Sequence, residues 1–212
     1  PAFTPFILRV NPEGKTVRIL QTVAIVGQSG KPVTGLPNIE GVDETPYEYS
    51  AQKILPFIPS GLDTEGLVRT TGGEFWIAEE YSPSLLRVDH TGKVLKRYIP
   101  SGLKLEGTDY PVAAVLPAIY TKRKINRGFE GLALSRDQQT LYAVLQSPLL
   151  NPDKKTGEGS RNTRLIVFDI PSEKVIGEYV YRFDTAKDFD PNPKTTPDEM
   201  KLSGAAFINP TT

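Results

Sequence analysis

The feature that most constrains this 212-residue chain is an internal repeat of a strand pair. In each copy a Glu-Gly-Leu start leads through a polar turn into an apolar run that ends in polar residues. The first copy covers Asp63–Val68 and Glu74–Tyr81, and the second covers Gly128–Leu134 and Thr140–Gln146. Self-similarity at a spacing of tens of residues is typical of repeat folds, in which each copy forms one structural unit.

A second repeated element consists of two apolar runs joined by a tight turn. It occurs at Phe6–Lys15, at Ser84–Lys93 and, without a glycine, at Leu165–Val175. β-Branched and apolar residues on both sides of turn formers predict β-hairpins. A strand pair followed by a hairpin makes a four-stranded antiparallel unit, so the sequence predicts an all-β fold built from β-propeller blades.

The predicted domain is a partial β-propeller of about three blades that occupies residues 1–212. We expect the outer hairpin of one blade at residues 3–25, full blades at 62–99 and 128–183, and the start of a further blade at 201–212.

Closed propellers contain about four to eight blades. The predicted partners are therefore the remaining propeller segments of the same protein, from outside this chain or on a second fragment. Without them we expect a group of apolar side chains to be exposed. This group consists of Val17, Ile19, Leu132, Leu134 and Phe207.

Composition excludes several classes of site and partner. Lysine plus arginine and aspartate plus glutamate each number 25, so no net field attracts nucleic acid or an anionic membrane. No apolar run approaches the roughly 20 residues that span a bilayer, and we expect no membrane partner. The chain has no cysteine, and its one histidine, His90, lies in a predicted turn, so a metal site would rely on oxygen ligands.

The long connections of the predicted blades emerge on one face. They cover residues 26–61, 100–127, 147–162 and 184–200, whereas the other connections are short turns. Long loops on a repeat scaffold usually carry binding and catalysis. We expect this face to collect the polar residues at the strand ends, namely Asp63, Glu65, Glu79, Glu80, Tyr81, Glu130 and Gln146.

The acidic members of this group predict a Ca²⁺ site, because Ca²⁺ prefers oxygen ligands and can activate water. The predicted metal ligands are Asp63, Glu65, Glu79 and Glu130, and the predicted catalytic residues are Glu130, Glu80 and Tyr81. A structural alternative is that Gly66 and Gly131 allow close packing while the two glutamates of the Glu-Gly-Leu starts bind backbone amides. For the Glu79–Glu80 pair the alternative is plain surface exposure.

A basic loop lies directly before the second Glu-Gly-Leu start. Arginine and lysine side chains at this face would suit a small anionic substrate. The predicted substrate-binding residues are Lys122, Arg123, Arg127 and Gln146. The alternative is that the run is a solvated loop.

These motifs also resemble a known family. Asp63–Leu67, Glu74–Tyr81 and Asn126–Ala133, followed by Leu145–Pro148, are similar in order and spacing to the phytase-like family (esterase-like activity of phytase). The resemblance covers most of residues 60–208 and implies a β-propeller with phosphoesterase or esterase activity, typically in periplasmic or extracellular proteins. The family commonly shows Asp-Glu-Tyr where this chain has Glu79-Glu80-Tyr81.

The leading functional hypothesis is a metal-assisted phosphoester hydrolase of the phytase or phosphatase type. Two alternatives stay open. One is a propeller without catalytic activity that binds a ligand or protein, which the lack of a recognised nucleophile favours. The other is a carboxylester or lactone hydrolase.

Overall fold

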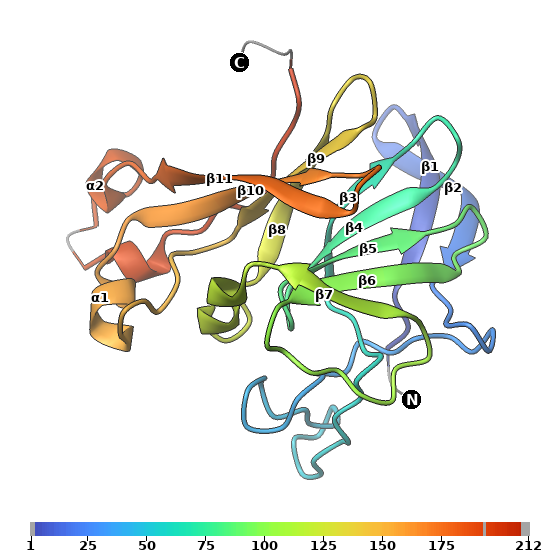
Figure 1. Cartoon of the computed structure of the whole chain (residues 1–212), viewed down its shortest axis with the longest axis horizontal. Coiled ribbons are helices and arrows are strands. Elements are labelled where there is room, and N and C mark those ends of the chain that lie inside the picture. The colour runs from blue at the N-terminus through green and yellow to red at the C-terminus, as the bar shows by residue number, and fades with distance from the viewer. Residues whose placement is uncertain (1–2, 193, 209–212) are drawn as a thin grey trace.

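Strands make up most of the regular structure in residues 3–192 and 194–208, which are the residues that this computed structural model describes (Figure 1). They form three sheets, with strand orders β1-β2, β3-β4-β5-β6-β7 and β8-β9-β10-β11. All neighbouring strands are antiparallel except β6 and β7. The prediction of an all-β fold with antiparallel sheets is confirmed.

The strands follow the predicted repeat. In the hairpin sheet they are β1 (Phe6–Glu13) and β2 (Thr16–Ala24). In the middle sheet they are β3 (Thr64–Arg69), β4 (Phe75–Glu79), β5 (Ser84–Val88), β6 (Val94–Pro100) and β7 (Val112–Leu116). In the last sheet they are β8 (Phe129–Leu134), β9 (Thr140–Leu145), β10 (Asn162–Asp169) and β11 (Lys174–Arg182).

In the described residues, four short helices lie in the connections. They are η1 (Ala118–Lys122), α1 (Lys154–Glu158), α2 (Ala186–Phe189) and η2 (Pro197–Glu199). None of the helices in the described ranges has the length and apolar character needed to cross a bilayer. In Figure 1 the long connections with these helices lie below and to the left, and the turns β1–β2, β3–β4 and β8–β9 lie above and to the right.

The connection predicted over 100–127 contains an additional strand. Residues Val112–Leu116 form β7, which pairs parallel with β6 and adds a fifth strand to the outer edge of the middle sheet. The Leu116 side chain at its end is fully buried, and Ser101 N donates to the Leu116 carbonyl at 2.8 Å. Burial of Leu116 and the pairing with β6 explain why the connection does not remain an open loop.

The predicted first strand of a further blade is not paired as a strand in residues 201–208. The segment instead lies beside the last sheet. Leu202 N donates to the carbonyl of Gln146, directly after β9, at 3.0 Å, and Gly204 and Ala205 lie against Gly131 of β8. Phe207 stacks on Tyr142 with ring centroids 5.9 Å apart. Residues 209–212 of this prediction lie outside the described residues.

Two apolar clusters join the sheets. Between the middle and last sheets, Trp76, Tyr98 and Phe168 pack together with ring centroids 5.0–5.8 Å apart. Between the hairpin and the middle sheet, Ile25 and Leu86 belong to a second buried cluster. Each sheet therefore buries a face against its neighbour, as blades of a propeller do.

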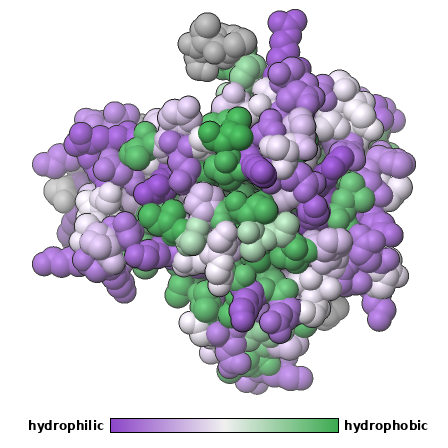
Figure 2. Space-filling model, viewed as in Figure 1, coloured by the Kyte–Doolittle hydropathy of each residue, from purple (hydrophilic) through white to green (hydrophobic). Residues whose placement is uncertain are grey.

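Exposure of apolar side chains agrees only partly with expectation. Val17 and Ile19 on β2 are 62% and 59% exposed, as predicted. Leu132, predicted to be exposed, is 4% exposed because β3 packs across β8 and covers it. Figure 2 shows hydrophobic residues reaching the surface down the middle of one face, between hydrophilic flanks.

A close backbone approach joins the innermost strands of the two larger sheets. A Cβ on Gly66 would lie 2.6 Å from the Glu130 carbonyl oxygen and 2.8 Å from the Leu132 Cβ. The equivalent residue of the next strand, Gly131, faces Gly204 and Ala205 in the same way, with the nearest atoms at 3.1–3.3 Å. The close packing at Gly66 and Gly131 that the structural alternative expected is present, but among the described residues neither Glu65 nor Glu130 accepts a hydrogen bond from a backbone amide.

We predict that Gly66→Ala lowers the free energy of unfolding by about 1–3 kcal/mol, because the methyl group would force β3 and β8 apart. Gly204→Ala is the matched control, since no described atom lies within 4 Å of its Cβ position, and we expect little change. Urea denaturation of both variants measures the difference. Equal stabilities would contradict the close approach.

Candidate functional site

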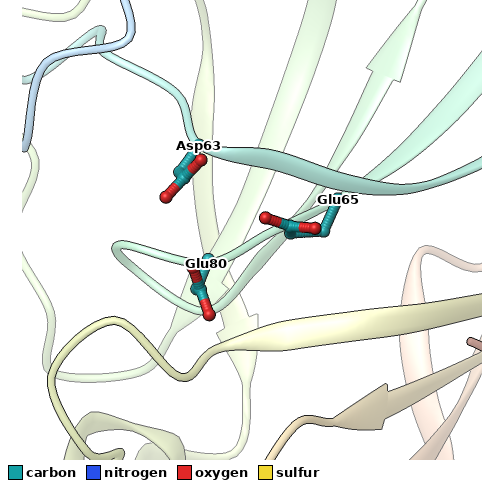
Figure 3. Close-up of side chains that lie close together, drawn as sticks. All are labelled: Asp63, Glu65 and Glu80. Carbon is teal, nitrogen blue, oxygen red and sulfur yellow. The ribbon is translucent and has the colours of Figure 1, made fainter. Parts of the chain in front are cut away.

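Three carboxylates meet where β3 begins and β4 ends (Figure 3). Asp63 directly precedes β3, Glu65 is its second residue, and Glu80 directly follows β4. One oxygen from each carboxylate lies within 4.8 Å of the others. Glu80 N donates to the Asp63 carbonyl at 3.1 Å, which fixes the two chain segments side by side.

Both glutamates of the Glu-Gly-Leu repeats, Glu65 and Glu130, lie at register shifts in the strand pairing beside this cluster. The β3–β4 register shifts between Thr64 and Leu67, and the β8–β9 register shifts between Phe129 and Gly131. Glu65 and Glu130 therefore lie in equivalent irregularities at the starts of their strands. β-Bulges often occur beside functional sites because the extra residue changes the direction of a side chain.

Burial and mutual repulsion weaken the acidity of this cluster. The pKa of Glu80 is raised to about 8, first by burial and then by the charges of Asp63, Glu65 and Glu130. The pKa of Glu65 is raised to about 7 by loss of solvent and by the charges of Glu130 and Asp63. Burial also raises the pKa of Asp63. Within the described residues, no lysine or arginine forms an ion pair with any of these four carboxylates.

Two carboxamides complete the group. Gln146 Nε2 donates to Glu80 Oε1 at 2.9 Å and contacts Glu130 Oε1, whereas the buried Gln146 Oε1 has no hydrogen-bond partner among the described residues. The amide of Asn126 lies against Asp63 Oδ2 and Glu80 Oε2, at 3.2 and 3.0 Å, and would donate to both carboxylates with its nitrogen toward them. Both amides thus end on the carboxylates.

The oxygen set fits a Ca²⁺-sized ion. Ca²⁺ binds oxygen ligands at about 2.3–2.6 Å, so opposite ligands lie about 4.6–5.2 Å apart. The oxygens of Asp63, Glu65 and Glu80 already lie within that span of one another. Carboxylate and carboxamide oxygens are the ligand types that Ca²⁺ prefers.

Glu79, predicted as a metal ligand, has a different set of partners. Its carboxylate is fully buried in an ion pair with Arg97 and also accepts hydrogen bonds from Ser84 Oγ, at 2.9 Å, and from three backbone amides. These donors occupy its oxygens, so the prediction does not fit the geometry. Glu79 holds the turn that carries Glu80.

Tyr81 and Arg123 also serve the scaffold. The Tyr81 hydroxyl donates to the Gly35 carbonyl at 3.1 Å, and its pKa is raised by burial, which keeps the phenol neutral. The Arg123 guanidinium forms a buried ion pair with Asp43 and donates to the Tyr81 carbonyl. Arg123 therefore has no free pair of donors for a substrate, and that prediction does not fit the structure.

The remaining predicted substrate-binding cations contact other loops. Lys122 Nζ donates to Asn151 Oδ1 at 2.8 Å, and Arg127 donates to Ser147 Oγ at 3.2 Å and to the Asp198 carbonyl. Lys124 forms an ion pair with Asp198. The basic loop thus binds the connections 147–162 and 184–200 through Asn151 and Asp198. Its cations do not converge on a common anion site in this arrangement.

Sequence comparison identifies the family. The family model described as phytase-like, esterase-like activity of phytase, matches residues 3–212. The chain belongs to the phytase-like family. The family expectation from the motifs is thus confirmed.

Other comparisons add less to the phytase-like assignment. A protein of Arthroderma benhamiae described as an uncharacterized secreted protein is 29% identical over 205 residues, covering 81% of this chain and 39% of that protein. The phytase-like chain thus spans about two fifths of that relative's length. A chain of Kuenenia stuttgartiensis hydrazine synthase aligns with a TM-score of 0.37 and 14% identity, over 78% of this chain and 40% of that chain.

Three residues that organise this site were not predicted. Arg97 lies in β6 two residues from Leu95 and from Ile99, so it shares their side of the strand, and a charge at such a position indicates a buried partner. Asp43 comes from the connection 26–61, which carries no regular strand or helix to place it. Asn126 has a left-handed backbone with φ 51°, a conformation in which asparagine is enriched.

We predict that Arg97→Met lowers the free energy of unfolding by about 3–5 kcal/mol, because it leaves the buried Glu79 carboxylate without its counterion. The double variant Arg97→Met/Glu79→Gln should recover part of this loss. Arg18→Met is the matched control, because the Arg18–Glu13 pair is exposed and contributes at most about 1 kcal/mol. Chemical denaturation decides: a cost for Arg97→Met no larger than that of the control would show that the pair does not support the site.

Proposed function

We propose that this chain carries the metal-binding part of a metal-assisted ester hydrolase. The main support is the convergence of Asp63, Glu65 and Glu80 at one point. Among the described residues no basic side chain pairs with them, and Gln146 Oε1, from a side chain that contacts Glu80, has no partner. Like charges that share a partly buried site need compensation, either by protons or by a cation. The family name, which refers to esterase-like activity, agrees with hydrolysis.

In this proposal Asp63, Glu65 and Glu80 hold Ca²⁺. A bound ion would supply a Lewis acid for the ester oxygen and would lower the pKa of water at the site. Glu130, which contacts Gln146 at the edge of the cluster, would be the residue that accepts a proton from the attacking water. A cavity of about 240 Å³ lined by Glu65, Glu130 and the segment Ser203–Ala205 gives a substrate access to these groups.

Phosphoester hydrolysis is the leading reaction, since a cation bound by carboxylates can neutralise a phosphoryl group without help from arginine. A carboxylester or lactone is the second candidate. It is favoured by the engagement of Arg123, Lys124 and Arg127 in contacts within the protein, which leaves them no role in binding an anion.

We also infer that the three sheets are blades of a β-propeller that further segments of the same protein complete. The exposed apolar residues of β2 and the adjacent inner strands β3 and β8 support this inference. The description of the Arthroderma benhamiae relative as secreted supports an exported protein.

The test measures hydrolysis of 4-nitrophenyl phosphate and of 4-nitrophenyl acetate by the full-length protein, with CaCl₂ or with EDTA. We expect Ca²⁺-dependent turnover of one ester, and we expect Glu80→Gln to lower kcat/KM by about 100-fold through loss of a ligand. Glu106→Gln, an exposed acid in the 100–111 connection, is the control and should retain activity.

Binding of Ca²⁺ without turnover of either ester would favour a non-catalytic propeller. Turnover that persists in EDTA, or that Glu80→Gln leaves intact, would overturn the proposed mechanism.

A further inference from the structure

Asn126 occupies a position that brings its side chain against the acids. It precedes Gly128, and a Cβ on Gly128 would lie 2.3 Å from the Glu80 carbonyl oxygen. The backbone at Gly128, two residues after Asn126, is therefore in direct contact with the backbone of Glu80. Asn126 itself has a left-handed backbone, which places its amide between Asp63 and Glu80.

The oxygen and the nitrogen of this amide have nearly the same size, but the nitrogen donates hydrogen bonds and the oxygen accepts them. With the nitrogen inward, Nδ2 would donate to both acids at 3.0–3.2 Å. With the oxygen inward, Oδ1 would meet two carboxylate oxygens with no donor among them. A turn of the amide by half a revolution therefore exchanges a hydrogen-bond donor for an oxygen ligand, and only a cation stabilises the second arrangement.

Gln146 gives independent evidence that the site lacks a component. It is 3% exposed, its nitrogen lies against Glu80 and Glu130, and its oxygen has no partner in the described part of the chain. A buried acceptor without a partner costs about 1–3 kcal/mol. A cation with its bound water beside the acids would supply the missing interaction.

We propose that Asn126 is a ligand of the divalent cation through Oδ1, and that Gln146 is the positioning residue that orients Glu80 and Glu130. This inference rests on the proposed metal site. In the cation-free protein the Asn126 amide takes the place of the ion by donating to the acids, and it turns its oxygen inward when the ion binds. Ligands then come from three separate chain segments, namely the start of β3, the residue after β4 and the loop before β8.

Calorimetric titration of the full-length protein with CaCl₂ tests this role. We expect Asn126→Leu to weaken Ca²⁺ binding by about 10-fold or more, because it removes one oxygen ligand. Asn126→Asp keeps the ligand oxygen and adds a charge, so it should bind at least as tightly as the wild type. Asn11→Leu, on β1, is the control and should leave binding unchanged.

The outcomes separate the two proposals. If the wild type binds no Ca²⁺, the metal site and the role of Asn126 both fail. If the wild type binds Ca²⁺ and Asn126→Leu binds it equally or more tightly, only the ligand role fails, because the amide then acts solely as a donor in the cation-free state. Should Asn126→Leu not fold, the Asn126→Asp variant decides, since weaker binding by it would also overturn the proposal.

Discussion

The arrangement of the site depends on the close approach of β3 and β8. Gly66 allows the backbone of β8 to come within contact distance, and no larger residue fits there without displacement. That approach brings Glu130 of the last sheet beside Glu65 of the middle sheet. Because both glutamates lie in equivalent register shifts, the repeat places a pair of converging acids where the two sheets meet.

Charge is distributed unevenly around this junction. The buried cations Arg97 and Arg123 neutralise Glu79 and Asp43, and these pairs fasten the turn after β4 to the surrounding loops. Asp63, Glu65 and Glu80 have no such partner among the described residues, and their pKa values are raised. Arginines thus neutralise the acids that support the fold. The converging acids Asp63, Glu65 and Glu80 stay available for a cation.

Much of the fold could be predicted from sequence, because turn formers between β-branched runs and the Glu-Gly-Leu repeat report local structure. β7 was missed because a parallel strand at a sheet edge depends on tertiary burial of Leu116 and has no turn signal. Within the site, the repeat located Glu65 and Glu130 but could not tell Glu79 from Glu80. Their alternation places one on each side of the sheet, and only the position of Arg97 decides which one is neutralised.

The central claim is that these acids share one cation, and anomalous diffraction tests it most directly. Crystals of the full-length protein would be soaked with Tb³⁺, which substitutes for Ca²⁺ at oxygen sites. The account predicts an anomalous peak about 2.3–2.6 Å from an oxygen of each of Asp63, Glu65 and Glu80. A map with no peak between these residues, while their carboxylates keep the positions described, would contradict it.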